Sequence, residues 1–186
     1  MRLFIALPLP RELKFTLYAY QQALREVSPK GRYVPFENFH ITLHFIGEST
    51  SLLEASSACN KAVAGIRPFT LKLLGFNSFR SGEGQTGYIK IGGELSELRA
   101  LHEVLLSSLL DYGFSLGSHK KFTPHITLGR GLNLEGEKGQ HIDFNSPGKT
   151  EFKANSLVLF ESRRENNSLT YAPLHTARRC HRPEIR

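Results

Sequence analysis

The sequence lacks the hallmarks of a membrane protein and of a disulfide or metal-cluster protein. No apolar run approaches the ~20 residues that a membrane helix needs. The apolar start, residues 1–8, is short, contains Pro8 and has no small-residue cleavage site, so we expect a strand and not a signal peptide. The two cysteines, Cys59 and Cys180, form neither a CxxC pair nor a metal-type cluster. We therefore expect a cytoplasmic protein that contacts no membrane and holds no metal.

Positive charge is in excess. Lys and Arg number 24 against 17 acidic residues, a net charge of +7. Such an excess attracts polyanions and is compatible with a nucleic-acid or nucleotide partner, although many soluble proteins are basic. Six arginines gather toward the C-terminus, where they form either a phosphate-contacting patch or a solvated end. They are Arg163, Arg164, Arg178, Arg179, Arg182 and Arg186.

Hydrophobic spacing predicts three helices. Apolar residues recur every three or four positions between Pro10 and Ser28, which is typical of an amphipathic helix. Ser51 and Glu54 form a capping-box pattern, and Gly65 ends the helix that they open. Ser96 is the expected cap of a third helix, whose apolar face runs from Leu98 to Tyr112 and which stops at Gly113.

Strand patterns alternate with these helices. The expected strands cover residues 3–7, 39–47, 69–74, 87–91, 122–130, 156–160 and 169–171, and residues 131–148 are expected to form a long loop. This order of elements predicts an α+β fold.

A tetrapeptide, His-Ile-Thr-Leu, occurs at residues 40–43 and again at 125–128. Each copy lies on a predicted strand that follows a helix, so the chain contains a duplicated unit, which folds most economically about a pseudo-two-fold axis. Alternation along a strand places the His and the Thr on one face and the apolar residues on the other. His44 shares the face of His40 but has no counterpart in the second copy, so it is expected to flank the groove or lie at the surface.

Two imidazoles and two hydroxyls without a carboxylate suit phosphodiester chemistry. One imidazole removes a proton from water, the other protonates the leaving oxygen, and hydroxyls with a nearby Arg stabilise the charged phosphate oxygens. Histidine fits both tasks because its pKa lies near neutrality. One His-x-Thr alone is usually only the polar face of a strand, whereas two identical copies indicate function. Zinc at His40 and His44 is disfavoured, because an i, i+4 pair chelates metal from a helix.

These motifs and the segments around them resemble the 2H phosphoesterase superfamily, specifically the RNA 2′,3′-cyclic phosphodiesterases also called 2′-5′ RNA ligases (the LigT-like family). The resemblance runs over residues 2–7, 35–43, 45–48, 124–130, 157–162 and 171–174. One departure is the absence of tryptophan. Relatives often carry Trp near the positions of Tyr33 and Tyr88.

The resemblance implies a single bilobal domain over residues 1–186, with two antiparallel sheets that face a central cleft and helices outside. It also implies metal-independent opening of an RNA 2′,3′-cyclic phosphate to a 2′-phosphate, weak ATP-independent 2′-5′ ligation, no cofactor and a monomer. By position, His40 and His125 form the acid–base pair, Thr42 and Thr127 bind the phosphate, and Arg130 helps to hold phosphate or base.

Other interpretations remain open. One is an RNA-end-binding module, which would need a damaged motif. Another is a 2H phosphodiesterase that acts on a small nucleotide or on 2′-5′ oligoadenylate. Within the site, strict alternation points Arg130 to the core, but its place after Gly129 allows it to turn toward the groove. There its charge would disfavour a protonated His125, which predicts His125 as the base for water and His40 as the acid.

Overall fold

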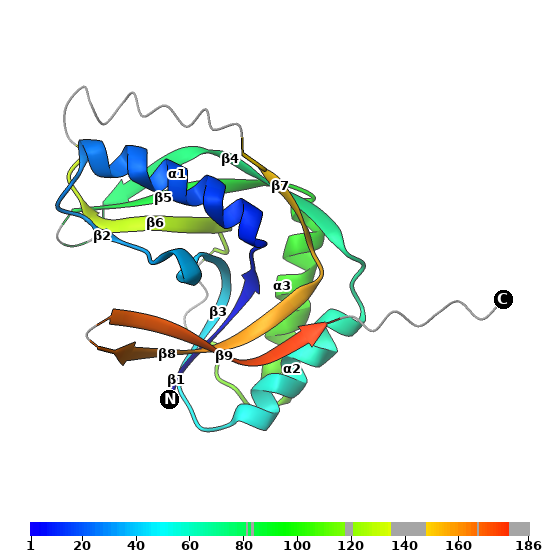
Figure 1. Cartoon of the computed structure of the whole chain (residues 1–186). Coiled ribbons are helices and arrows are strands. Elements are labelled where there is room, and N and C mark those ends of the chain that lie inside the picture. Colours follow the sequence, from blue (N-terminus) through cyan, green and yellow to red (C-terminus); the bar gives the residue numbers. More distant parts are fainter. Residues whose placement is uncertain (81, 83, 118–120, 135–147, 167, 179–186) are drawn as a thin grey trace.

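Two antiparallel β-sheets and three α-helices make up the part of the chain that the computed structural model describes, residues 1–80, 82, 84–117, 121–134, 148–166 and 168–178 (Figure 1). Sheet A has the strand order β3-β1-β8-β9 and sheet B the order β2-β6-β5-β4-β7. The strands of sheet A are β1 (Arg2–Pro8), β3 (His40–Glu48), β8 (Ser156–Glu165) and β9 (Ser168–Arg178). Those of sheet B are β2 (Arg32–Tyr33), β4 (Phe69–Arg80), β5 (Gln85–Gly93), β6 (His125–Leu132) and β7 (Glu151–Ala154). The predicted α+β fold is confirmed.

The helices cover the two sheets from different sides. Helix α1 (Arg11–Val27) lies along sheet B, whereas α2 (Leu52–Ala64) and α3 (Leu95–Asp111) pack against each other beside sheet A (Figure 1). A short 3₁₀ helix, η1 (Phe36–Asn38), leads directly into β3. The two copies of the tetrapeptide therefore lie on different sheets, at the start of β3 and at the start of β6.

Helix α1 forms where the apolar spacing predicts it. Leu13, Leu17 and Leu24 are fully buried, and Tyr20 is nearly so. Pro10 lies just before the first helical residue, where its missing N–H removes no helical hydrogen bond. Burial of side chains of this size contributes roughly 1.5–3 kcal/mol each, so tertiary packing holds this helix in place.

One predicted helix start is confirmed and one is wrong. Ser51 is the N-cap of α2, as predicted, but its side chain makes no capping hydrogen bond. Helix α3 begins at Leu95, one residue before Ser96, because the side chain of Glu94 accepts a hydrogen bond from the backbone N–H of Thr70 and ties the helix start to β4. Gly65 and Gly113 do end α2 and α3, and Gly113 has a positive φ of 83°.

Several strands extend beyond the sequence prediction. Strands β4 and β5 form a hairpin that continues to Arg80 and Gln85, and β6 continues to Leu132, into the segment predicted to be a loop. The larger part of that predicted loop, residues 135–147, lies outside the described residues. Tyr112, assigned to the apolar face of α3, is exposed.

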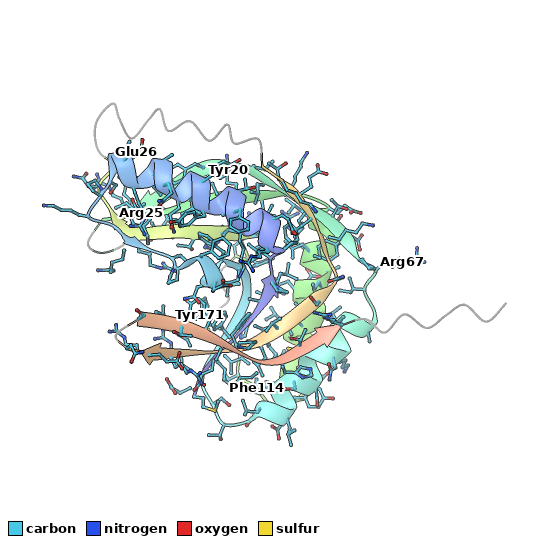
Figure 2. All side chains as sticks on the ribbon, in the orientation of Figure 1. Tyr20, Arg25, Glu26, Arg67, Phe114 and Tyr171 are labelled. Atoms are coloured by element: carbon cyan, nitrogen blue, oxygen red, sulfur yellow. The ribbon has the colours of Figure 1, made fainter. Side chains whose placement is uncertain are left out.

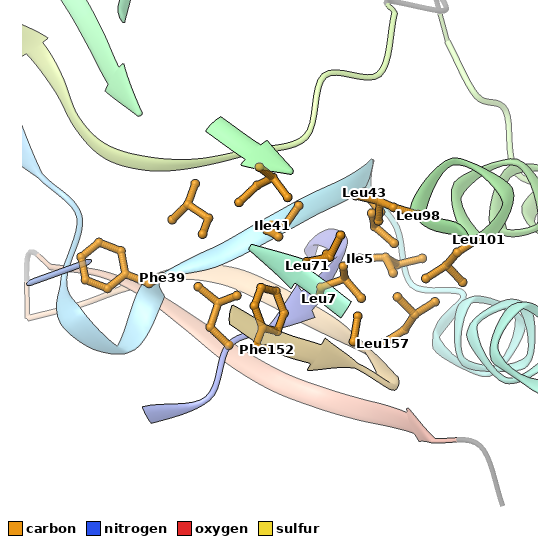
Figure 3. Packing of buried hydrophobic residues seen from close by; sticks show 14 of the residues in the cluster. Ile5, Leu7, Phe39, Ile41, Leu43, Leu71, Leu98, Leu101, Phe152 and Leu157 are labelled. Carbon is orange, nitrogen blue, oxygen red and sulfur yellow. The ribbon is translucent and has the colours of Figure 1, made fainter. Parts of the chain in front are cut away.

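Both sheets contribute to one hydrophobic core. Leu7 of β1 and Ile41 of β3 belong to the same buried cluster as Leu71 of β4, Phe152 of β7 and Leu98 of α3 (Figure 3). The Ile of each tetrapeptide is fully buried. Packing of these inward residues therefore fixes which way the intervening His and Thr side chains point.

Each tetrapeptide contains an irregularity in strand pairing at its last residue. On β3, His44 pairs with Ile5 and Thr42 pairs with Ala6, so Leu43 is skipped. On β6, Thr127 and Gly129 pair with consecutive residues of β5. Leu128, the equivalent of Leu43, is therefore skipped. A β-bulge shifts the alternation of side chains by one residue. The repeat therefore includes the backbone irregularity at the last residue of each motif.

Candidate active site

A cleft of about 580 Å³ brings the two motifs together. It is lined by Arg32, Tyr33, Val34, Pro35, Asn38, His40, Thr42, Phe45, His125, Thr127, Arg130, Arg164, Ser168, Leu169 and Tyr171. All five predicted site residues are among them: both histidines, both threonines and Arg130. The His-x-Thr pair of sheet A and that of sheet B line the same cleft.

Hydrogen bonds orient the ring of His40. Its Nδ1 lies 2.7 Å from the carbonyl oxygen of Asn38, which can only accept, so Nδ1 donates. In the neutral ring Nε2 then carries the lone pair, and the hydroxyl of Thr42 donates to it at 2.8 Å. The atom available for proton transfer is thus Nε2, and Thr42 contacts it directly.

His125 repeats this arrangement. Its Nδ1 lies 2.7 Å from the carbonyl oxygen of Thr123, again two residues earlier in the chain. In each motif a backbone carbonyl therefore holds Nδ1 and leaves Nε2 for chemistry. The edge of Tyr88 packs against the ring of His125, with 5.3 Å between ring centroids.

The surroundings of the two rings differ. His40 lies among three aromatic rings, with centroid distances of 5.1 Å to Phe4, 5.2 Å to Tyr171 and 6.4 Å to Phe160. Burial among these rings lowers the pKa of His40 from its ordinary value of 6.5 to about 4. The charges of His125, Lys14 and Arg130 act in the same direction, against the bond to the Asn38 carbonyl. His40 is therefore neutral near pH 7 in the free protein.

The fifth residue after each histidine also lines the cleft. Strict alternation assigns Phe45 and Arg130 to the core side, but the bulges at Leu43 and Leu128 shift both toward the cleft. Phe45 is 65% exposed, so the expectation that the apolar residues of this strand share one face is wrong at this position. In the structure Arg130 does turn toward the groove, as its position after Gly129 allowed.

Three residues that sequence reasoning missed organise the site. The buried Asn38 supplies the carbonyl for His40, and its side chain donates to the carbonyl of Leu169 in β9 at 2.7 Å. The buried Gln21 of α1 donates to the carbonyls of Val34 and Leu128 at 2.8 and 2.9 Å. Tyr171 lies on the side of the β8–β9 hairpin that faces sheet B (Figure 2). In the sequence, Gln21 is a polar residue on the apolar stripe of α1, and Asn38 and Tyr171 lie in segments that carry the family resemblance.

The residues at the positions of the expected tryptophans have different tasks. Tyr33 lines the cleft, but its hydroxyl lies 2.7 Å from the carbonyl oxygen of Ser28 and 3.0 Å from that of Leu24; these carbonyls share its one hydrogen, which ties β2 to the end of α1. Tyr88 contacts His125. His44 is half-buried and is not among the residues that line the cleft; the bulge at Leu43 that shifts Phe45 toward the cleft shifts His44 to the other face, so the prediction that it shares the face of His40 is wrong.

The C-terminal arginines that the structure describes have different surroundings. Arg163 lies 2.7 Å from Glu165 and 3.5 Å from Glu161, so its charge is compensated. Arg164 lines the cleft, and Arg178 belongs to β9. The remaining three, Arg179, Arg182 and Arg186, lie outside the described residues.

Cys59 is a free, buried thiol whose pKa is raised to about 12 by burial, which indicates a packing role, and Cys180 lies outside the described residues. Within the described ranges, no three His, Cys, Asp or Glu side chains gather as a possible metal site. In those same ranges no helix is long and apolar enough to cross a membrane.

Comparison with known proteins gives a consistent set of relatives. The sequence-family model of the 2′-5′ RNA ligase superfamily matches residues 16–166 of this chain. An RNA 2′,3′-cyclic phosphodiesterase of Thermotoga maritima is 30% identical over 132 residues, 70% of each chain. One of Methanocaldococcus jannaschii is 26% identical over 182 residues, 92% of this chain and 96% of the relative.

Solved structures show the same architecture. The protein TT0787 of Thermus thermophilus aligns with a TM-score of 0.75 at 25% identity, over 96% of this chain and 97% of that one. LigT of Escherichia coli in its apo form aligns with a TM-score of 0.70 at 25% identity, over 95% and 96%. A further structure of LigT is a complex with 3′-AMP. The similarity therefore extends over nearly the whole chain.

Proposed function

Because the chain belongs to the 2′-5′ RNA ligase superfamily, we propose that it hydrolyses the 2′,3′-cyclic phosphate at the end of an RNA strand to a 2′-phosphate. The observation that carries this proposal is the geometry of the two histidines. Both line one cleft, both have Nδ1 held by a backbone carbonyl, and both keep Nε2 for proton transfer. The names of the relatives, RNA 2′,3′-cyclic phosphodiesterases, support the choice of substrate.

In the proposed reaction a water molecule attacks phosphorus and the bond from phosphorus to O3′ breaks. One imidazole Nε2 takes a proton from the water, and the other gives a proton to O3′. The hydroxyls of Thr42 and Thr127 and the guanidinium of Arg130 hydrogen-bond the non-bridging oxygens, where negative charge concentrates. Weak 2′-5′ ligation would use the same groups in the same sense, with a 5′-hydroxyl in the place of water: O5′ loses its proton and bonds to phosphorus, and O3′ leaves as a hydroxyl.

Which histidine is the acid and which is the base stays a prediction, but the reason given for it, the nearness of Arg130 to His125 in the sequence, is wrong. The charge of Arg130 acts on His40, so proximity in sequence does not set His125 apart as the neutral ring. If His40 is the acid, the negative charge of the bound phosphate has to raise its pKa before the reaction. A substrate whose 3′ leaving group needs no protonation distinguishes the roles, because it should restore activity only to the variant that lacks the acid.

Groups around the phosphate site are suited to hold a terminal nucleotide. Phe45 offers an exposed ring on which a base can stack, and Arg130 faces the same cleft from the opposite sheet. The alternative of an RNA-end-binding module without activity is less economical, since both motifs are intact and converge on one cleft. A small cyclic nucleotide and 2′-5′ oligoadenylate remain the competing substrates.

The decisive experiment incubates the pure protein, in excess EDTA, with an oligonucleotide that ends in a 2′,3′-cyclic phosphate. We expect a single product with its phosphate on the 2′ oxygen, mapped by its mobility against synthetic 2′- and 3′-phosphate standards. A double variant, H40A with H125A, is the matched control for contaminating nucleases. Loss of activity in EDTA with recovery on adding a divalent ion, or a 3′-phosphate product, would contradict the proposal.

A further inference from the structure

A second cavity lies directly beside the cleft. It measures about 390 Å³, and Asn38, His40 and Tyr171 line both cavities. From Tyr171 it follows the same face of the β8–β9 hairpin as far as Thr176 and Arg178. We call this cavity the β9 groove. Because it shares three lining residues with the cleft, a strand whose end occupies the cleft can continue into it.

The β9 groove has the chemistry of a polynucleotide site. Lys14 of α1 and Arg178 of β9 are cations in its lining, and Phe160 and Pro173 give it an apolar surface. Nζ of Lys14 donates to the backbone carbonyl of Glu37 at 2.7 Å, so the cation is fixed in place beside His40. Fixed cations attract phosphates, and apolar or aromatic surfaces accept sugar and base faces.

The charge balance of the groove favours an anion. Among the described residues that line it, Glu37 is the one acid; its carboxylate lies 3.6 Å from Nζ of Lys14, and its side chain is 81% exposed. Arg178 is an exposed residue that pairs in register with Ser156 of β8. A cationic peptide would be repelled here, whereas an RNA backbone is attracted.

We propose that the β9 groove binds the nucleotide that precedes the cyclic-phosphate end of an RNA strand. The inference rests on the proposed function, because it assumes that the cyclic phosphate occupies the cleft. It adds a substrate preference. Oligonucleotides gain contacts in the β9 groove that a cyclic mononucleotide has no atoms to make.

The test measures kcat/KM for two substrates, adenosine 2′,3′-cyclic phosphate and an RNA trinucleotide with the same cyclic end. Thr176→Trp fills the β9 groove, and Arg178→Gln removes a cation. Loss of one charged phosphate contact corresponds to about a tenfold loss in kcat/KM. We expect each variant to show this loss on the trinucleotide and to keep its activity on the mononucleotide.

Matched controls come from surfaces outside the groove. Leu174→Trp introduces the same side chain elsewhere on β9, and Arg99→Gln removes the same charge from α3; neither residue lines the groove. Both controls should leave both activities unchanged. Equal losses on the two substrates, or no loss on the trinucleotide, would overturn the inference while the proposed function stands. Failure of the unaltered protein to hydrolyse either substrate would overturn the proposed function and the inference with it.

Discussion

Protonation of His40 should destabilise the folded protein. The ring is packed against Phe4 and Tyr171, and the charges of Lys14, Arg130 and His125 all oppose a further positive charge there. In the unfolded chain this histidine has its ordinary pKa of 6.5, whereas in the folded protein the pKa is about 4. The unfolded state therefore binds the proton first as the pH falls, and the fold loses free energy of unfolding below pH 6.5.

The size of the loss follows from the two pKa values. Each pH unit between them costs about 1.4 kcal/mol. At pH 5 the loss attributable to His40 is about 2 kcal/mol, and it levels off at about 3 kcal/mol near pH 4. Above pH 6.5 the contribution is fully retained. The His40→Gln substitution removes the titrating group and therefore the part of the pH dependence of the unfolding free energy that comes from His40.

Urea denaturation of the unaltered protein and of His40→Gln, at pH 7, 6 and 5, measures the difference. The unfolding free energy of the unaltered protein minus that of His40→Gln should fall by about 2 kcal/mol from pH 7 to pH 5. Other titrating groups cancel in this comparison. Parallel curves would refute the reasoning, as would an NMR titration in which the His40 ring takes up its proton near pH 6.5.

Three further predictions concern the site and its supports. His40→Ala and His125→Ala should each lower kcat by roughly 10²–10⁴-fold with an unchanged circular dichroism spectrum; near-normal turnover by either variant would refute the two-imidazole mechanism. Gln21→Leu should lower the free energy of unfolding in urea by about 1–3 kcal/mol, because the Val34 carbonyl loses its amide donor and the Leu128 carbonyl keeps only the backbone N–H of Val34, and unchanged stability would mean that water replaces the amide. Truncation after Arg178 should make the salt dependence of RNA affinity shallower, whereas an unchanged slope would identify the removed tail as a solvated end.

Local pattern was enough to predict the elements that bear the chemistry. The apolar spacing of α1 and the alternation in His-Ile-Thr-Leu are short-range consequences of helix and strand geometry. They identified one helix face and two strand faces, each strand with a His and a Thr on the polar side. The duplication added the expectation that the two faces meet, and the described structure has both in one cleft.

Sequence reasoning erred where long-range contacts compete with local signals. Ser96 is a good N-cap by type, but the tie from Glu94 to Thr70 starts α3 earlier. Phe45 fits the apolar alternation, but a bulge at Leu43 turns it into the cleft. A short stretch of sequence shows neither the early start of α3 nor the bulge, because each depends on a partner strand that lies elsewhere in the chain.

The sequence by itself determined which residues carry the proposed chemistry, since the identity and spacing of His40, Thr42, His125 and Thr127 need no partner to be recognised. Only the tertiary structure decided how unequal the two histidines are. The motifs are identical in sequence, yet three aromatic rings from β1, β8 and β9 surround His40, and its pKa falls because protein atoms replace the water that would solvate its charge. Solvation depends on what packs around a group in space, and a repeated tetrapeptide carries no record of it.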